Sequence, residues 1–253
     1  MLPFKGRPIV LAAAVFALAS SAQALVVNVD FDYATNGSGT YSGQGAYSDP
    51  GNNFWNSIHY LNVDFPPVLK ASDGSTDTGI TVSISGYPDA FDFSGGGDPG
   101  PLASSLMQDY LYTYNNGSSP VLFSIGGLTA GETYQFYFYS AVGGNNSVRD
   151  RQAVFTLDGV SQNVNGYSSV TGGSALYSLF VLGDNYLEFT VTPTGTSLAG
   201  SFYTPTSGEA EFNGLQIVQI PEPSTCAWIA GLGVLVLAIA NRPKSRSPNK
   251  DLI

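Results

Sequence analysis

Four residues near the start of the chain have the types and spacing that suit sugar binding. Tyr41, Tyr47 and Trp55 offer aromatic rings, and Asn53 offers an amide within the same short segment. An aromatic ring stacks on the C–H face of a sugar, while an amide donates to and accepts from its hydroxyls. Because large aromatic side chains also fill protein cores, the alternative is that Trp55 packs inside the fold and binds no ligand.

Five carboxylates are candidate calcium ligands: Asp30, Asp32, Asp73, Asp77 and Glu211. Two of them flank Gly74 in a loop that begins like an EF-hand calcium loop but lacks the downstream glutamate that would complete it. The two aspartates near the start of the domain could share a site with Glu211, or with Glu209, if the first and last strands are neighbours. The alternative is that these carboxylates are ordinary solvated side chains in turns.

Residue counts exclude several catalytic sites. His59 is the only histidine and Cys226 the only cysteine, which excludes zinc sites built from several imidazoles or from thiolates. No nucleophile elbow supports a serine triad around His59. Carboxylate pairs that could cleave a glycosidic bond are not a specific signal in so acidic a segment. We therefore expect a protein that is not an enzyme, and the alternative is a secreted hydrolase or lyase acting on polysaccharide.

The elements that position these side chains are predicted to be short strands. Val27, Val29 and Phe31 alternate with polar residues, as in a strand with one face in a core. Strand-like patterns cover residues 27–32, 80–84, 121–125, 134–140, 153–157, 160–164, 176–182, 186–192 and 215–220. Asp158-Gly159 has the composition of a hairpin turn, and residues 102–112 fit either a short helix or a strand. The pattern predicts an all-β fold, an antiparallel β-sandwich or jelly roll.

Three glycine-rich stretches, residues 36–53, 86–101 and 194–208, are predicted to be long loops. Loops of this length in an ordered domain often carry function. The first of them holds three of the four candidate sugar-binding residues, and Trp55 follows directly after it.

Residues 25–220 are strongly acidic. They contain three basic side chains against seventeen acidic ones, a net charge of −14. Such a surface repels nucleic acid and anionic lipid, so we expect neither as a partner. Cation binding would account for the acidity, and so would a merely solubilising surface. The segment holds no cysteine, so the domain depends on packing or on metal rather than on disulfides.

The first 24 residues have the parts of a secretory signal peptide. Lys5 and Arg7 provide positive charge, an apolar run follows, and Ala22-Gln23-Ala24 gives the small side chains that signal peptidase accepts. We therefore expect the secretion machinery to export the chain and signal peptidase to cleave it after Ala24. Residues 25–220 would then form the ectodomain.

The end of the chain has the form of a short membrane segment. Residues 226–240 are apolar and would form a helix about 22 Å long, which is short for a free-standing span of about 20 residues. The basic residues Arg242, Lys244 and Arg246 follow. Because positive charge stays on the cytoplasmic side, the ectodomain is predicted to lie outside the inner membrane, with residues 247–253 as a cytoplasmic tail.

Directly before that helix stands a tripeptide, Pro221, Glu222 and Pro223. Together, the tripeptide, short helix and basic end (residues 221–246) resemble the PEP-CTERM sorting signal of Gram-negative bacteria. The resemblance implies that an exosortase recognises the tripeptide and cleaves near it, after a transient stay in the inner membrane. The protein would then lie at the cell surface or in the extracellular matrix, beside exopolysaccharide. The tail beyond the basic residues departs from the usual pattern, and an ordinary single-pass anchor is the alternative.

A second resemblance covers most of the ectodomain. Residues 27–31 open it, residues 127–134 lead into an aromatic strand, residues 151–159 follow, and residues 212–217 close it. This order is similar to that of galactose-binding-like jelly rolls. The resemblance implies two antiparallel sheets with the first and last strands near each other, and it implies structural calcium as a candidate cofactor. A fold alone does not establish ligand binding. The ectodomain is therefore predicted to be non-catalytic, either a glycan-binding module or a purely structural one.

Overall fold

The computed structural model describes residues 24–32, 41–59, 68–85, 89–92, 106–107, 109–140, 151–165 and 180–221. Residues Ala24–Ile220 form one compact unit. Among the described residues, no helix has the length and hydropathy that a membrane span requires. The predicted signal peptide up to Gln23 and the sorting signal after Pro221 lie outside the described residues and remain predictions.

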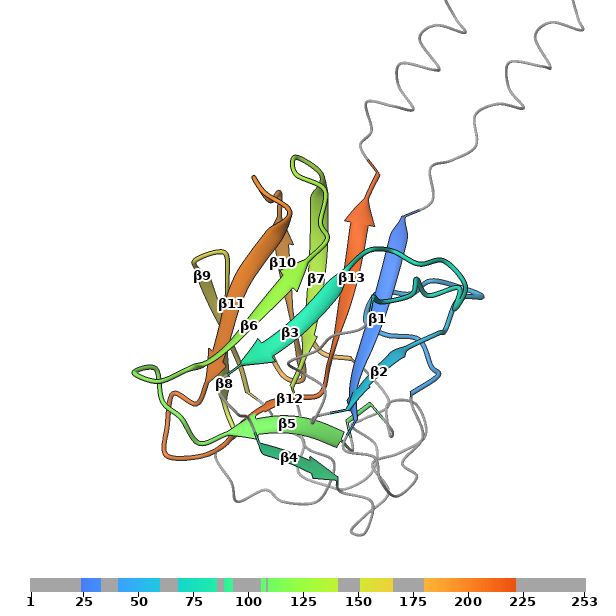
Figure 1. The fold of residues 1–253 in the computed structure, drawn as a ribbon. Helices are drawn as coiled ribbons and strands as arrows, with labels where there is room; N and C mark the ends of the chain where they lie inside the picture. The colour runs from blue at the N-terminus through green and yellow to red at the C-terminus, as the bar shows by residue number, and fades with distance from the viewer. Residues whose placement is uncertain are drawn as a thin grey trace, which may run out of the picture. The chain divides into compact units, whose positions relative to one another are not determined.

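The described residues contain thirteen strands and no helix (Figure 1). The strands are β1 (Leu25–Asp32), β2 (Asn56–His59), β3 (Thr81–Ser85), β4 (Asp89–Asp92), β5 (Asp109–Thr113), β6 (Val121–Gly126), β7 (Thr133–Tyr139), β8 (Ala153–Leu157), β9 (Val160–Val164), β10 (Tyr186–Val191), β11 (Ser197–Tyr203), β12 (Ala210–Phe212) and β13 (Gly214–Ile220). The first sheet has the order β10-β7-β13-β1-β2, the second β3-β6-β11-β8-β9, and the third β12-β5-β4.

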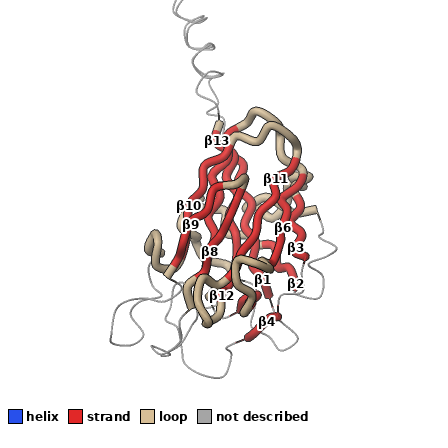
Figure 2. The backbone as a smooth tube through the Cα atoms, turned by 90° about the vertical axis from the view of Figure 1, so that its left-hand side faces the viewer, coloured by secondary structure: helices blue, strands red, loops and turns tan. Residues whose placement is uncertain are grey.

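The two five-stranded sheets face each other as a β-sandwich, and the third sheet lies at one end of it (Figures 1 and 2). This architecture confirms the predicted all-β class. β1 and β13 pair antiparallel, with Leu25 opposite Gln219, so the first and last strands are neighbours as expected. β1 also pairs in parallel with β2, so the first sheet is mixed and not purely antiparallel. The predicted hairpin turn joins β8 to β9 with positive φ at Asp158 and Gly159.

Two of the predicted loops contain strands. β11 lies within the expected loop 194–208, and β4 lies within the expected loop 86–101. β11 was not predicted because its core-facing positions read Leu198, Gly200 and Phe202, and the glycine breaks the apolar alternation. Gly200 interrupts the pattern for a packing reason, since a Cβ there would lie 2.2 Å from the ring of Phe123.

In two further segments the observed secondary structure differs from the predicted one. The segment 102–112 ends in β5, a strand and not a helix. In the predicted strand 176–182, only residues 180–182 are described, and their sole pairing is an isolated bridge between Leu182 and Tyr186. The short strands β2 and β12 were too brief to give a periodic signal of their own.

Apolar side chains from both large sheets fill the space between them, including Val27, Val29 and Phe31 of β1. Phe138 of β7 lies at the centre of an aromatic cluster. Its ring centroid is 5.3–5.5 Å from those of Phe123, Phe155, Phe189 and Phe212. Aromatic pairs at such separations add about 0.5–1.5 kcal/mol each beyond their area burial, so this cluster contributes to the stability of the sandwich.

The polar face of β1 is also buried, although the alternation predicts an exposed one. Asn28, Asp30 and Asp32 point away from the sandwich core and are nevertheless 2%, 3% and 6% exposed. A second, smaller core covers this outer face of the first sheet. Its buried members are Val26, Tyr41, Trp55, Leu106, Met107, Tyr137, Tyr139 and Val218. The loop that contains the candidate sugar-binding residues is thus part of the packed structure.

Candidate functional site

Gln216 of β13 holds the loop 41–55 on the outer face of the first sheet. Its amide nitrogen donates to the carbonyl of Tyr47 at 3.1 Å and to Asn28 Oδ1 at 2.8 Å. Its oxygen accepts from the Tyr47 backbone N–H at 3.0 Å and from the Tyr139 hydroxyl. A Cβ at Gly45 would lie 2.2 Å from that oxygen, so glycine is required for this close approach. Both backbone groups of Tyr47 are therefore fixed, and its ring has a defined position.

Trp55 and Tyr41 are buried in this second core, 2% and 6% exposed. The Trp55 ring packs edge-on against Tyr41 at 5.0 Å and lies 6.0 Å from Tyr139. Its indole N–H donates to the carbonyl of Gly43 at 2.9 Å. In this arrangement neither ring presents a face to a sugar, because protein side chains already occupy both. The packing alternative for Trp55 fits the structure, and the proposed stacking role does not.

Tyr47 belongs to a group that sequence analysis did not assemble. Its ring centroid lies 6.1 Å from that of Tyr137, which lies 6.2 Å from that of Tyr186. Gln135 Nε2 donates to Glu188 Oε1 at 3.0 Å, and the Tyr137 hydroxyl donates to Gln135 Oε1 at 3.1 Å. We call Tyr47, Gln135, Tyr137, Tyr186 and Glu188 the tyrosine patch. Except for Tyr137, which is buried, its members are partly exposed.

Strand pairing explains why these residues meet. β10 pairs with β7, and Glu188 lies directly opposite Tyr137 in that register. Gln135 and Tyr186 stand two residues from this pair along their own strands, so all four side chains point to the same face. The alternation along β7 predicts this face, but nothing in the sequence tells which strand lies beside β7. Asn53, the remaining predicted sugar ligand, is exposed and accepts a hydrogen bond from Gln44.

The patch is rich in hydrogen-bond acceptors. Burial, with Glu188 and the neighbouring tyrosines, raises the pKa of the Tyr137 hydroxyl to about 12. Burial and Glu188 also raise the pKa of Tyr186. Both phenols therefore stay protonated at neutral pH, and Glu188 is the charged group among them. A ligand at this surface would meet aromatic rings beside a carboxylate, which is the combination that sugar-binding sites use.

Asp30 and Asp32 lie side by side on β1 but are engaged within the fold. Asp30 Oδ2 accepts from the Tyr41 N–H at 2.8 Å, and Asp32 Oδ2 accepts from Ser57 Oγ at 3.2 Å. Burial, against the pull of the Tyr41 hydrogen bond, raises the pKa of Asp30 to about 8. A neutral carboxyl at pH 7 is a poor calcium ligand.

The loop that resembles an EF-hand start closes on itself. Asp73 Oδ1 accepts from the N–H groups of Ser75 and Thr76 at 2.7 and 2.9 Å, and Oδ2 accepts from the Thr76 hydroxyl at 2.7 Å. These bonds hold the pKa of Asp73 well below its usual range. Asp77 contributes a backbone bridge to Lys70. Within the described residues, no group of three or more acidic, histidine or cysteine side chains is arranged to hold a metal.

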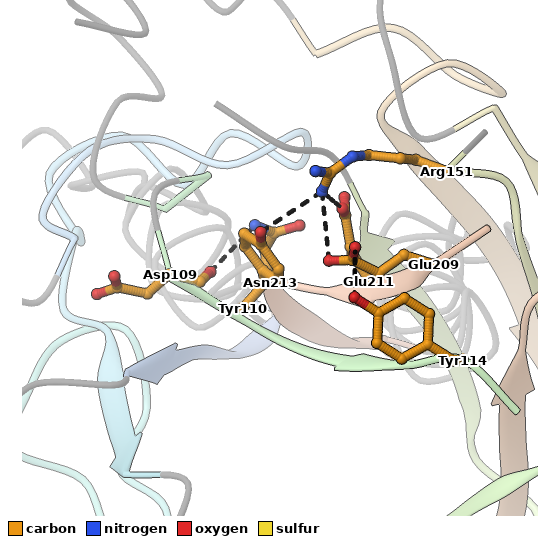
Figure 3. A network of polar contacts seen from close by, with 7 residues as sticks. All are labelled: Asp109, Tyr110, Tyr114, Arg151, Glu209, Glu211 and Asn213. Carbon is orange, nitrogen blue, oxygen red and sulfur yellow. Dashed lines mark hydrogen bonds and ion pairs between the residues drawn. The ribbon is translucent and has the colours of Figure 1, made fainter. Parts of the chain in front are cut away.

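Glu211 takes part in an ion triad rather than joining the aspartates of β1 (Figure 3). Arg151 Nη1 contacts Glu211 Oε1 directly and lies 3.4 Å from Glu209 Oε1 and from the Tyr110 hydroxyl. Burial raises the pKa of Glu211 to about 8, against the opposing effect of Arg151. Burial lowers the pKa of Arg151, but its acidic neighbours and Tyr110 more than offset this and raise it overall. Because Arg151, Glu209 and Glu211 are all buried, this triad is closed to a substrate.

A row of tyrosines lies beside the triad on the third sheet. The rings of Tyr110 and Tyr112 are 6.1 Å apart, and those of Tyr112 and Tyr114 are 5.6 Å apart and nearly perpendicular. Tyr114 is 62% exposed, and its hydroxyl donates to Glu209 Oε2 at 3.3 Å. This row offers the exposed ring of Tyr114 and the partly exposed ring of Tyr112, but its carboxylate, Glu209, is buried and contacts Arg151, whereas Glu188 of the tyrosine patch is partly exposed.

No protein-family model and no curated protein sequence matches this chain. Solved structures with a similar arrangement include the protein YXIM from Bacillus subtilis, at 14% identity and a TM-score of 0.39 over 77% of this chain. They also include the ANX1 ectodomain from Arabidopsis thaliana, at 14% identity and a TM-score of 0.45 over 79% of this chain. A third is beta-glucuronidase 2 from Bacteroides uniformis, at 13% identity and a TM-score of 0.41 over 79%. The matches span 40%, 42% and 18% of those chains.

Proposed function

We propose that the ectodomain binds extracellular polysaccharide at the tyrosine patch without cleaving it. The observation that carries the proposal is the gathering of three tyrosine rings beside Gln135 and Glu188 on one face of the first sheet. The rings offer stacking surfaces, and the amide and carboxylate offer hydrogen bonds. Glu188 is the only acid among the five residues of the patch, whereas glycoside hydrolysis generally uses two carboxyl groups. This count favours binding over catalysis.

A glycan array followed by calorimetry on residues 24–220 tests the proposal. This segment is a compact unit with its own core, so it can be produced without the terminal segments. We expect saturable binding that Tyr186→Ala weakens at least about tenfold, the loss of roughly 1.4 kcal/mol of stacking. Tyr114→Ala is the matched control, since it removes an exposed tyrosine from the third sheet. Equal affinities for wild type and Tyr186→Ala would refute the assignment to the patch.

The same incubations separate binding from polysaccharide cleavage. Release of reducing ends would favour the alternative of a hydrolase, and unsaturated sugar ends would favour a lyase. We expect neither product, because Glu209 and Glu211, the acidic pair in contact with Arg151, are buried and out of reach of a substrate.

We also propose that the protein is exported and then sorted to the cell surface or the extracellular matrix through its PEP-CTERM signal. Support comes from the sequence: a signal peptide at one end, and at the other the order of tripeptide, short apolar helix and basic residues. A periplasmic ectodomain would present Pro221, Glu222 and Pro223 to an exosortase just outside the inner membrane.

Replacement of the tripeptide by three alanines tests the sorting proposal. We expect an uncleaved precursor in the inner membrane, detected by immunoblotting of fractions and by mass spectrometry of the C-terminus. Alanines at Ser224 and Thr225 form the neighbouring control and leave processing intact. Mature surface protein that still ends at Ile253 would show that the segment is an ordinary anchor.

A further inference from the structure

Glu188 carries a negative charge that no described cation neutralises. Lys70 and Arg151 are the only lysine and arginine among the described residues. Arg151 is committed to Glu209 and Glu211. The backbone N–H of Lys70 bonds to Asn56 Oδ1 at 2.9 Å, at the start of β2. β2 and β10 are the opposite edges of the first sheet, four strand spacings or about 19 Å apart.

The hydrogen bonds within the tyrosine patch engage Glu188 through Oε1 and leave acceptor sites of this partly exposed carboxylate available. The Tyr137 hydroxyl donates to Gln135, and the Gln135 amide donates to Glu188 Oε1. These bonds use donors of the patch internally and end on the carboxylate. Glu188 Oε2 and the phenol oxygens supply further acceptor sites beside the rings. An acceptor-rich surface with one net negative charge is matched by a cationic group that has several N–H donors and no lone pair, which describes a primary ammonium.

We infer that the tyrosine patch recognises an amino sugar, with the ammonium of the ligand on Glu188 and its ring against Tyr186. This inference rests on the proposed function and names its ligand class. A protonated amine gains a charge-assisted hydrogen bond that a hydroxyl or an acetamide at the same carbon lacks. The net charge of −14 on the ectodomain attracts the same ligand over a longer range and disfavours acidic glycans.

Three hexasaccharides separate the ammonium from the rest of the sugar: β-linked glucosamine, its N-acetylated form and the matching glucose polymer. Calorimetry on residues 24–220 is run at a mildly acidic pH at which the amine is charged. We expect the glucosamine hexamer to bind at least about tenfold more tightly than the other two, with a preference that falls as salt is added.

Glu188→Gln should lower the affinity for the glucosamine hexamer to that for the neutral hexamers, because it keeps the shape and an acceptor for Gln135 but removes the charge. Glu132→Gln at the start of β7 is the matched control, with the same change of net charge on the same chain. Equal binding of all three hexamers, or a preference that survives Glu188→Gln, would overturn the inference while leaving glycan binding in place. Failure of the glucosamine hexamer alone would also overturn it. Absence of binding across the full glycan array would instead remove the proposed function itself.

Discussion

Replacement of Asp30 by asparagine should stabilise the protein at alkaline pH and leave it unchanged in acid. Asp30 is 3% exposed, its Oδ1 has no hydrogen-bond partner among the described residues, and burial raises its pKa from 3.8 to about 8. A carboxyl whose folded pKa is raised binds its proton more tightly in the native state. Its stabilising effect is therefore complete below about pH 4 and is lost as the pH rises through about 8. The substituted asparagine would stay neutral throughout, and its oxygen can accept the Tyr41 N–H.

The expected gain in the free energy of unfolding follows from the pKa shift of Asp30. About four pH units at 1.36 kcal/mol each set a ceiling of about 6 kcal/mol at pH 9. Relaxation and entry of water around the ionised group reduce this, so we expect a gain of about 2–4 kcal/mol. For a domain of this size, that corresponds to an increase in Tm of about 4–16 °C. At pH 4 the two proteins should melt within about 2 °C of each other.

Thermal unfolding of residues 24–220 by circular dichroism at pH 4, 6, 7.5 and 9 measures the difference. Asp158→Asn in the exposed β8–β9 turn removes the same charge at a site that tolerates asparagine with positive φ. This control should follow the wild-type profile. If Asp30→Asn also follows the wild-type profile at every pH, Asp30 is not held protonated by burial and the reasoning fails.

The remaining predictions concern stability and need only unfolding curves. Arg151→Met should cost about 3–5 kcal/mol in urea at pH 9, because it leaves the ionised Glu211 buried without its cation. The loss should shrink below about pH 8, where Glu211 is protonated in the wild type as well; a pH-independent loss would contradict this. Gly45→Ala should cost about 1–3 kcal/mol, since its Cβ would displace the Gln216 side chain from its hydrogen bonds. An unchanged urea midpoint would show that the Gln216 side chain can move aside without loss of stability. Gly159→Ala should cost about 1 kcal/mol through backbone strain at φ +78°, because the space around the residue is open and a Cβ would meet no other atom. A larger loss would show that backbone strain at this residue is not the whole cause.

Local pattern was enough to predict the strands of the sandwich but not their partners. Alternation identified β1, β7, β10 and β13, and an Asp-Gly pair identified the β8–β9 turn. Pairing is a long-range property, so the meeting of Tyr137 with Glu188 had no local signal. β11 was missed because Gly200 takes a core-facing position between Leu198 and Phe202, where the pattern expects an apolar side chain.

Burial was the other property beyond the reach of pattern. A strand with alternating polar residues reads as half-exposed, yet the loop 41–55 covers the polar face of β1. The same covering loop buries Tyr41 and Trp55, which composition alone marks as available for stacking. Tyr47, from the same loop, remains partly exposed because Gln216 fixes its backbone at the margin of the covered region.

The position of β13 in its sheet has a mechanical consequence. β13 is the last strand, and it is hydrogen-bonded on one side to β7 and on the other to β1. A force applied at Ile220 along the strand would have to shear both ladders together, whereas an edge strand would peel away one bond at a time. If the chain is tethered at its C-terminal end, a pulling force on the ectodomain would therefore act along β13, the direction in which both hydrogen-bonded ladders resist it together.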